Sequence, residues 1–215
     1  SYNIWLLYGS SNNIIEGNSL TYQQFSFGFG IGLVGSYNNI VGNNITDNWG
    51  GIELGGSYNN ISSNIIIQNY VFGIQLTGGE SNFIIGNRIT NTAVYEGIYA
   101  PWGSSNLVIM NNNISFNGDE NVQLLHVSNS IIANNVMSNS GENGLYLYAS
   151  SNNMIVNNTI TNNPGNAVNI WEGSYNNFIS SNQISNSNNG IFVDTNSRYT
   201  KITTNIITNN THYGI

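Results

Sequence analysis

Four acidic side chains recur at one position of the sequence pattern. Glu96, Asp119, Glu120 and Glu142 each lie two or three residues before a short hydrophobic run, and these three runs follow one another at intervals of 23 or 24 residues. If consecutive runs stack side by side, the carboxylates gather in one patch, where they can bind Ca²⁺, an ion that takes about six to eight oxygen ligands. The alternative is that these acids only decorate a polar loop and that no cofactor is bound.

Aromatic residues form a second group on the same runs. Residues alternate along each run, so the central residue points outward. Tyr99 and Tyr146 hold this position, while Trp102 and Trp171 follow nearby. Rings can stack on sugar C–H groups while amides and acids bond the hydroxyls, so the four residues predict a glycan-binding face. Exposed rings are also found at protein interfaces and as ordinary strand residues.

Catalysis on this face would need a base. His126 directly follows one of the runs and is the single candidate, with Tyr146 and Tyr148 one repeat further on. The competing interpretation is a structural histidine beside tyrosines. The chain has no G-x-S-x-G, H-E-x-x-H or phosphate-binding glycine motif, so an enzyme is the less favoured class.

Acceptor sequences of the form N-x-S/T offer a modification chemistry. Such sites face solvent wherever they flank an inward residue, so glycosylation is sterically feasible in a secreted protein. They begin at Asn44, Asn60, Asn113, Asn157 and Asn209.

Two repeated frames must position these residues. One reads N-x-I-x-x-N-x-I and occurs nine times, and the other is G-I-x-L, whose members are mostly 21 to 24 residues apart. Internal periods of this length indicate a solenoid. The sixth position of the first frame is Asn each time, which predicts a ladder of Asn18, Asn43, Asn64, Asn87, Asn112, Asn134, Asn158, Asn182 and Asn205.

The pattern predicts an all-β fold. Each period holds three short alternating pieces, which favours three strands per coil, and about nine coils over residues 1–215 form a single parallel β-helix domain. Neither end carries a polar cap, so we expect the chain to be a segment of a longer solenoid or a subunit that self-associates end to end.

Composition restricts the partners. Charged residues are only 6% of the chain and the net charge is −7, which argues against nucleic acid, while 45 Asn, 25 Ser and 13 Thr supply a polar surface instead. There is no cysteine, hence no disulfide, and no apolar run long enough to insert into a membrane.

The succession of G-I-x-L, G-S-x-N-N and I-x-x-N-x-I over almost the whole chain resembles the right-handed parallel β-helix repeat of the NosD-type and pectate-lyase-like superfamily. The resemblance implies that the ladder occupies the tight turn between the second and third strands of each coil. It also implies that lyases and hydrolases of this fold act on the face of the first sheet.

We therefore expect an extracellular or cell-surface module with a structural or adhesive role, and with glycan binding on the first sheet. Its partner would be a polysaccharide or a cell-surface glycan. The alternative is a polysaccharide-active, lyase-like enzyme that uses the same face. A Thr-bearing face, as in ice-binding solenoids, is a remote third interpretation, since Ile67 and Met137 interrupt the Thr column.

Overall fold

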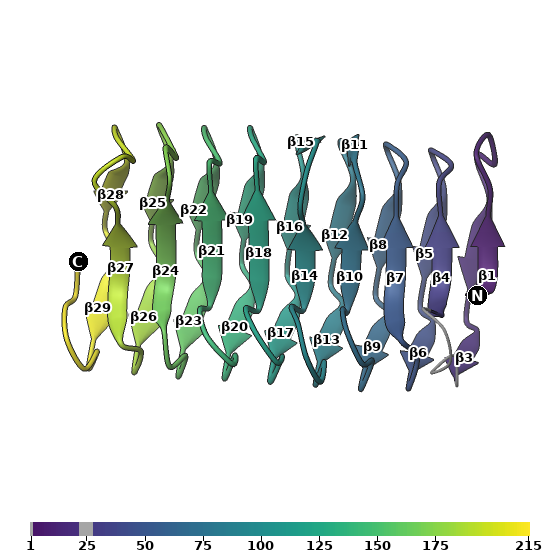
Figure 1. Cartoon of the computed structure of the whole chain (residues 1–215), viewed down its shortest axis with the longest axis horizontal. Coiled ribbons are helices and arrows are strands. Elements are labelled where there is room, and N and C mark those ends of the chain that lie inside the picture. The colour runs from purple at the N-terminus through teal and green to yellow at the C-terminus, as the bar shows by residue number, and fades with distance from the viewer. Residues whose placement is uncertain (1, 22–27) are drawn as a thin grey trace.

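The chain winds into a rod of stacked coils. The computed structural model describes residues 2–21 and 28–215. In these residues all named elements are strands, and no helix is long and apolar enough to cross a membrane. Figure 1 shows the coils side by side along the rod, with the two ends of the chain at opposite ends. The expected parallel β-helix of about nine coils, with three strands per coil, is confirmed.

Three parallel sheets run along the rod, and consecutive strands of each sheet come from consecutive coils. The first sheet faces the viewer in Figure 1 and contains β1 (Tyr2–Leu6), β4 (Phe29–Leu33), β7 (Gly50–Leu54), β10 (Ile74–Leu76), β14 (Ile98–Ala100), β18 (Val122–Leu125), β21 (Leu145–Tyr148), β24 (Asn166–Trp171) and β27 (Asn189–Val193). The second sheet contains β2 (Ile14–Glu16), β5 (Asn39–Val41), β8 (Asn60–Ser62), β12 (Phe83–Ile85), β16 (Val108–Met110), β19 (Ile131–Ala133), β22 (Met154–Val156), β25 (Phe178–Ser180) and β28 (Lys201–Thr203).

The third sheet contains β3 (Ser19–Thr21), β6 (Asn44–Thr46), β9 (Ile65–Ile67), β13 (Arg88–Thr90), β17 (Asn113–Ser115), β20 (Val136–Ser138), β23 (Thr159–Thr161), β26 (Gln183–Ser185) and β29 (Ile206–Thr208). A small extra pair, β11 (Gly79–Glu80) and β15 (Ser104–Ser105), lies in the turns after the first sheet. We call the turn from the first to the second sheet turn A, from the second to the third turn B, and from the third back to the first turn C.

Stacked aliphatic side chains form the core. Successive coils place an inward residue above its equivalent, as in the register Ile84–Ile109–Ile132 of the second sheet, and all three are fully buried. Met137 is also an inward residue, paired with Ile114 and Ile160. The Thr column predicted to contain Met137 therefore contains Ser138 instead. An isolated coil could not bury its aliphatic row, so the coils stabilise one another.

The glycine of G-I-x-L is required by close packing where the chain enters the first sheet. A Cβ added to Gly73 would lie 2.3 Å from Cγ2 of Ile89 and 2.5 Å from the carbonyl oxygen of Gly97. Distances this short leave no room for a side chain. The third sheet and the first sheet therefore meet at a corner that only a very small residue fits.

An amide ladder fills turn B. The backbone N–H and Nδ2 of Asn87 donate to Oδ1 of Asn112 at 2.8 and 3.1 Å, and Asn112 donates in the same way to Asn135 at 3.0 Å from each nitrogen. Nδ2 of Asn112 also donates to the carbonyl oxygen of Ile84, 2.8 Å away. Each amide therefore satisfies backbone groups that the turn leaves unpaired.

One member of the predicted ladder is wrong. Asn134 is exposed, with a positive φ of 55°, and Asn135 takes its place. The cause is the doublet Ile131–Ile132, because Ile132 is the inward residue whereas Ile131 is exposed. Choosing the first isoleucine shifted the frame by one residue. The other ladder positions lie in turn B as expected.

Turns A and C contain shorter ladders that the sequence analysis did not identify. In turn A, Asn13, Asn38, Asn59 and Asn82 are linked through Oδ1 acceptors, as in turn B. In turn C, Asn48 donates to Asn69, and Ser140 donates to Asn163. Ser and Thr replace Asn at several of these positions, which hid the period from a search for Asn alone.

The turn B ladder makes a testable prediction. Asn112→Ala removes the acceptor of the Asn87 backbone N–H and the side-chain donor to the Ile84 carbonyl, and it should lower the free energy of unfolding by about 1–3 kcal/mol. The neighbouring Asn113 is exposed, so Asn113→Ala is the matched control and should be nearly neutral. Thermal and denaturant unfolding of both variants gives the comparison, and equal losses would contradict this account of the turn.

Candidate functional site

Three of the predicted acidic residues meet where turn C enters the first sheet. Glu96 precedes β14, and Asp119 and Glu120 precede β18 in the next coil. One carboxyl oxygen from each of the three lies within 4.8 Å of the others. Glu96 is only 5% exposed and Glu120 only 3%, whereas Asp119 is half-buried. Glu142, the fourth predicted acid, is exposed one coil further on.

Burial changes the acidity of this cluster. Burial raises the pKa of the Glu96 carboxyl from its ordinary value of 4.5 to about 7, and the nearby Asp119 carboxyl adds to the effect. Burial likewise raises the pKa of Glu120 to about 8, with further contributions from Asp119, Glu142 and Glu96 and an opposing hydrogen bond from Asn143. Both shifts favour the protonated carboxyl because a charge is poorly solvated there.

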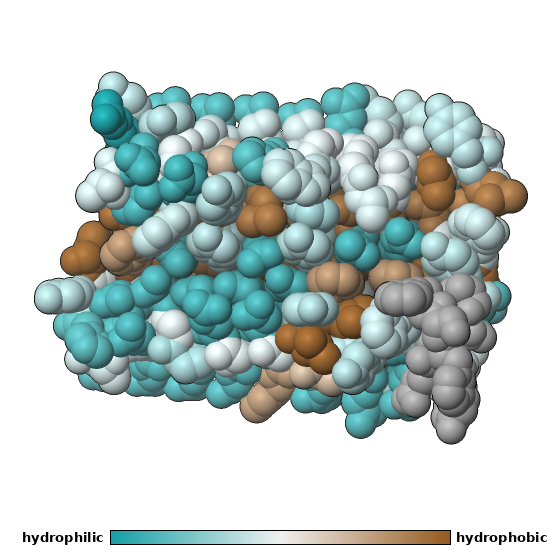
Figure 2. Space-filling view, viewed as in Figure 1, coloured by the Kyte–Doolittle hydropathy of each residue, from teal (hydrophilic) through white to brown (hydrophobic). Residues whose placement is uncertain are grey.

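A hollow of about 380 Å³ opens beside the cluster, and we call it the acidic groove. This volume lies within the range of ordinary ligand sites, roughly 300–1,000 Å³. Figure 2 shows hydrophilic residues gathered over the starts of strands β18 to β27 on this face of the rod. The groove is lined by Asp119, Glu120, Gln123, Glu142, Asn143, Tyr146, Asn169 and Trp171.

Two of the three amide side chains that line the groove donate hydrogen bonds to Glu120. Nδ2 of Asn143 donates to Oε1 of Glu120 at 3.0 Å, and Nε2 of Gln123 donates to Oε2 at 3.3 Å. Asn169 differs, because it is only 9% exposed and its Oδ1 has no hydrogen-bond partner. Oε2 of Glu96 is also buried without a partner.

Five outward side chains of the first sheet form one column along the rod. Tyr99, Gln123, Tyr146, Asn169 and Phe192 pair in register on β14, β18, β21, β24 and β27. Alternation along each strand turns them away from the core. Burial raises the pKa of the Tyr146 hydroxyl to about 12, and the Glu120 carboxyl contributes next.

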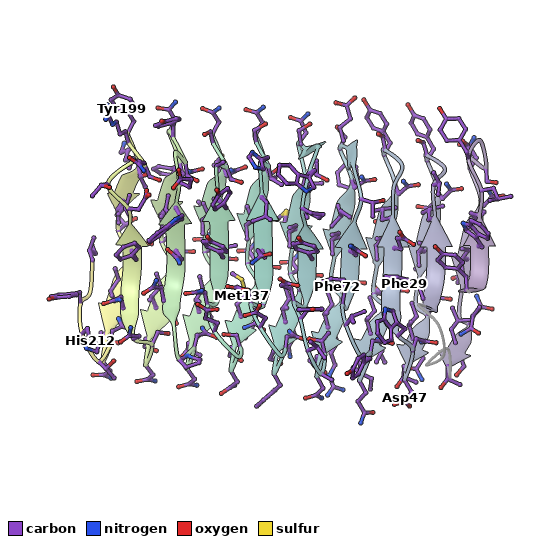
Figure 3. The ribbon with its side chains drawn as sticks, in the orientation of Figure 1. Phe29, Asp47, Phe72, Met137, Tyr199 and His212 are labelled. Carbon is purple, nitrogen blue, oxygen red and sulfur yellow. The ribbon has the colours of Figure 1, made fainter. Side chains whose placement is uncertain are left out.

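The predicted aromatic residues fall into two places. Tyr146 and Trp171 line the groove. Tyr99 stacks on Phe72, with ring centroids 5.1 Å apart, and Phe72 is labelled near the start of β10 in Figure 3. Trp102 is 63% exposed and lies in turn A, which follows the first-sheet strands, whereas the carboxyl cluster precedes them. It is therefore not part of the groove lining.

His126 lies with Trp102 and away from the carboxyl groups that line the groove. Its ring stacks on Trp102 with centroids 4.4 Å apart, and it meets Tyr148 edge-on at 5.8 Å. The structure therefore places the predicted base at the end of the strands opposite to the carboxyl cluster. A catalytic role for His126 stays a prediction.

The sequence analysis missed Gln123, Asn143 and Asn169 as site residues. Gln123 and Asn169 occupy the same outward column as Tyr99 and Tyr146, so the alternation could have identified them. Asn143 offered less signal, since Asn is common throughout the chain. Of the acceptor asparagines, Asn44, Asn113, Asn157 and Asn209 are exposed, while Asn60 is half-buried and donates to Asn39 and Ser62.

The raised carboxyl pKa values predict the pH dependence of stability. Between about pH 4.5 and pH 8 the folded protein retains protons on Glu96 and Glu120 that the unfolded chain releases. The free energy of unfolding should therefore fall as the pH rises through this window. Replacing Glu120 by Gln should flatten the fall in melting temperature, whereas Glu16→Gln, at an exposed position of the first coil, should not. Parallel curves for all three proteins would contradict the assignment.

Several solved structures of known proteins share this fold. A search of curated proteins found no match. The Dettilon tailspike protein gp208 has a TM-score of 0.74 at 16% identity over 96% of this chain and 46% of its own length. The periplasmic alginate epimerase AlgG has a TM-score of 0.75 at 17% identity over 89% of this chain and 58% of its own.

The A-module of Azotobacter vinelandii mannuronan C-5 epimerase AlgE4 has a TM-score of 0.63 at 17% identity, over 98% of this chain and 74% of that module. The chain spans about half the length of the tailspike and less than two thirds of AlgG. At these identities the likeness concerns the fold. The family profile described as "Right handed beta helix region" matches residues 1–109 and 96–215, so the chain belongs to the right-handed β-helix family.

Proposed function

We propose that this β-helix binds a polysaccharide in the acidic groove of its first sheet. The observation that carries the proposal is the composition of the groove, where the rings of Tyr146 and Trp171 share one hollow with carboxyl and amide groups. Rings offer flat apolar faces for sugar C–H groups, and the polar groups can bond hydroxyls. The epimerases with the same fold are named for alginate and mannuronan, which supports a carbohydrate ligand.

The shape of the rod favours a polymer over a small sugar. The outward column of the first sheet repeats at the coil spacing of about 4.8 Å, so a ligand can make the same type of contact on several coils. Each contact is weak, and a chain that spans several of them gains affinity through multivalency. An adhesive role outside the cell, on an extracellular polysaccharide, forms part of this proposal.

A glycan array tests the proposal. Wild-type protein should bind a set of polysaccharides, and the double variant Tyr146→Ala, Trp171→Ala should bind them about tenfold more weakly or not at all, because each stacked ring contributes about 0.5–1.5 kcal/mol. Tyr175→Ala removes an exposed ring outside the groove lining and is the matched control. The array is run with Ca²⁺ and with a chelator, which also tests the predicted ion. Full binding by the double variant would return this face to a purely structural role.

Cleavage of the bound glycan is a second candidate, favoured by the carboxyl of Glu120. Because burial raises its pKa to about 8, this group is protonated at neutral pH and can donate a proton to a leaving sugar oxygen. Asp119, with a carboxyl oxygen within 4.8 Å, would then attack the sugar carbon as the nucleophile, and water would release the sugar in a second step. A lyase is less well supported, because no Arg or Lys side chain in the described part of the chain lies on the first sheet. Arg88 is on the third sheet, Lys201 is on the second sheet, and Arg198 is in the turn between β27 and β28. New reducing ends in the array mixtures, lost in Glu120→Gln, would establish hydrolysis.

A further inference from the structure

The hydrogen bonds of the acidic groove leave acceptors free. The side-chain nitrogens of Asn143 and Gln123 both donate to Glu120. Oδ1 of Asn169, on a side chain nine-tenths buried at the other end of the groove, has no partner. A buried acceptor without a partner is costly, and an amide oxygen is satisfied by a donor. Oδ1 of Asn169 therefore needs a donor from a ligand.

The spacing of the carboxyl cluster is compatible with one bound ammonium group. An ammonium has three N–H donors and no acceptor. Three oxygens that each lie about 2.8 Å from one tetrahedral nitrogen are roughly 4.6 Å from one another. The oxygens of Glu96, Asp119 and Glu120 all lie within 4.8 Å of one another. Oε2 of Glu96 is buried without a partner, so one acceptor is already desolvated there.

The negative charge of the groove also favours a cationic ligand over an anionic one. The chain has only three basic side chains, and all three lie on other faces of the rod. Asp119, Glu120 and Glu142 line the groove itself. A carboxylate on a ligand would bring only acceptors and a like charge, whereas a hydroxyl both donates and accepts, and an ammonium only donates.

We infer that the acidic groove is selective for glycans that carry free amino groups, such as polymers of 2-amino sugars, and that it rejects polyuronates. This inference rests on the proposed polysaccharide binding. The amino group lies at the end of the groove that Asp119 and Glu120 line, next to the buried Glu96, and the sugar rings stack towards Tyr146 and Trp171. The selectivity differs from that expected of an alginate-binding protein, although the fold is shared.

Calorimetric titration with three oligosaccharides of equal length tests this selectivity. Glucosamine oligomers should bind about tenfold or more tightly than N-acetylglucosamine oligomers, and oligouronates should not bind. Added salt should weaken the glucosamine complex, because partly exposed charges are screened. Asp119→Asn and Glu142→Gln should each reduce the preference for the free amine. Glu142 is exposed, so its replacement leaves the core unchanged.

Asp47→Asn is the matched control. Asp47 is half-buried in turn C of an N-terminal coil and lies at the edge of the rod in Figure 3, away from the middle coils, so this variant should bind as wild type does. Equal affinity for free and acetylated amines overturns the selectivity and leaves polysaccharide binding intact. Oligouronate binding that depends on Ca²⁺ overturns it in favour of a metal-bridged site. Absence of binding to every glycan overturns both proposals.

Discussion

The constraint on which the rest of this structure depends is that each coil must return to the same place above the last. Strand pairing sets a spacing of about 4.8 Å, and the amide ladder of turn B fixes the register, because an interior asparagine such as Asn112 bonds both the coil before it and the coil after it. The inward isoleucines reinforce this register, since a slip by one residue would turn each strand inside out. Loops of different length in turn C are tolerated because the ladders and the core hold the coils in place on both sides.

This register gives the acidic groove its geometry. Glu96 and Glu120 are far apart in sequence, yet they occupy equivalent positions in adjacent coils, each two residues before a buried residue of the first sheet. Their proximity is a property of the scaffold and needs no local motif. The same scaffold places Tyr146 and Asn169 beside them on the next two coils. A rigid arrangement of this kind is pre-organised for a ligand, since little ordering is needed on binding.

The fold could be predicted from sequence because the signal is repeated nine times, whereas the site occurs once. The pentapeptide G-S-Y-N-N shows that an identical short sequence can occupy two different registers of the coil. At Gly35 its fourth residue, Asn38, joins the turn A ladder, and Tyr37 has a positive φ of 60°. At Gly173 the fifth residue, Asn177, joins the ladder instead, and Asn176 has the positive φ. The next inward isoleucine decides the register in both cases, so identical letters take different roles. The same effect led to the choice of Asn134 in place of Asn135. Whether a side-chain amide such as that of Asn143 or Asn169 has a hydrogen-bond partner depends on contacts in the folded chain, which the spacing of residues does not reveal.

A comparison between coils indicates that Glu96 and Glu120 are not needed by the rod. The equivalent positions in the three coils that follow hold Asn143, Asn166 and Asn189, and these asparagines satisfy one another: Oδ1 of Asn143 accepts from the Asn166 backbone at 2.8 Å, and Oδ1 of Asn166 accepts from Nδ2 of Asn189 at 2.7 Å. In a preceding coil the position holds Phe72, which packs on Tyr95 and Tyr99. In this column an amide can therefore pair with its neighbours and a ring can pack on its neighbours, while a buried carboxyl must either keep its proton or find a cation. Two adjacent carboxyls in place of amides weaken the scaffold, and such a local departure from the repeat is expected where a site has been built into it.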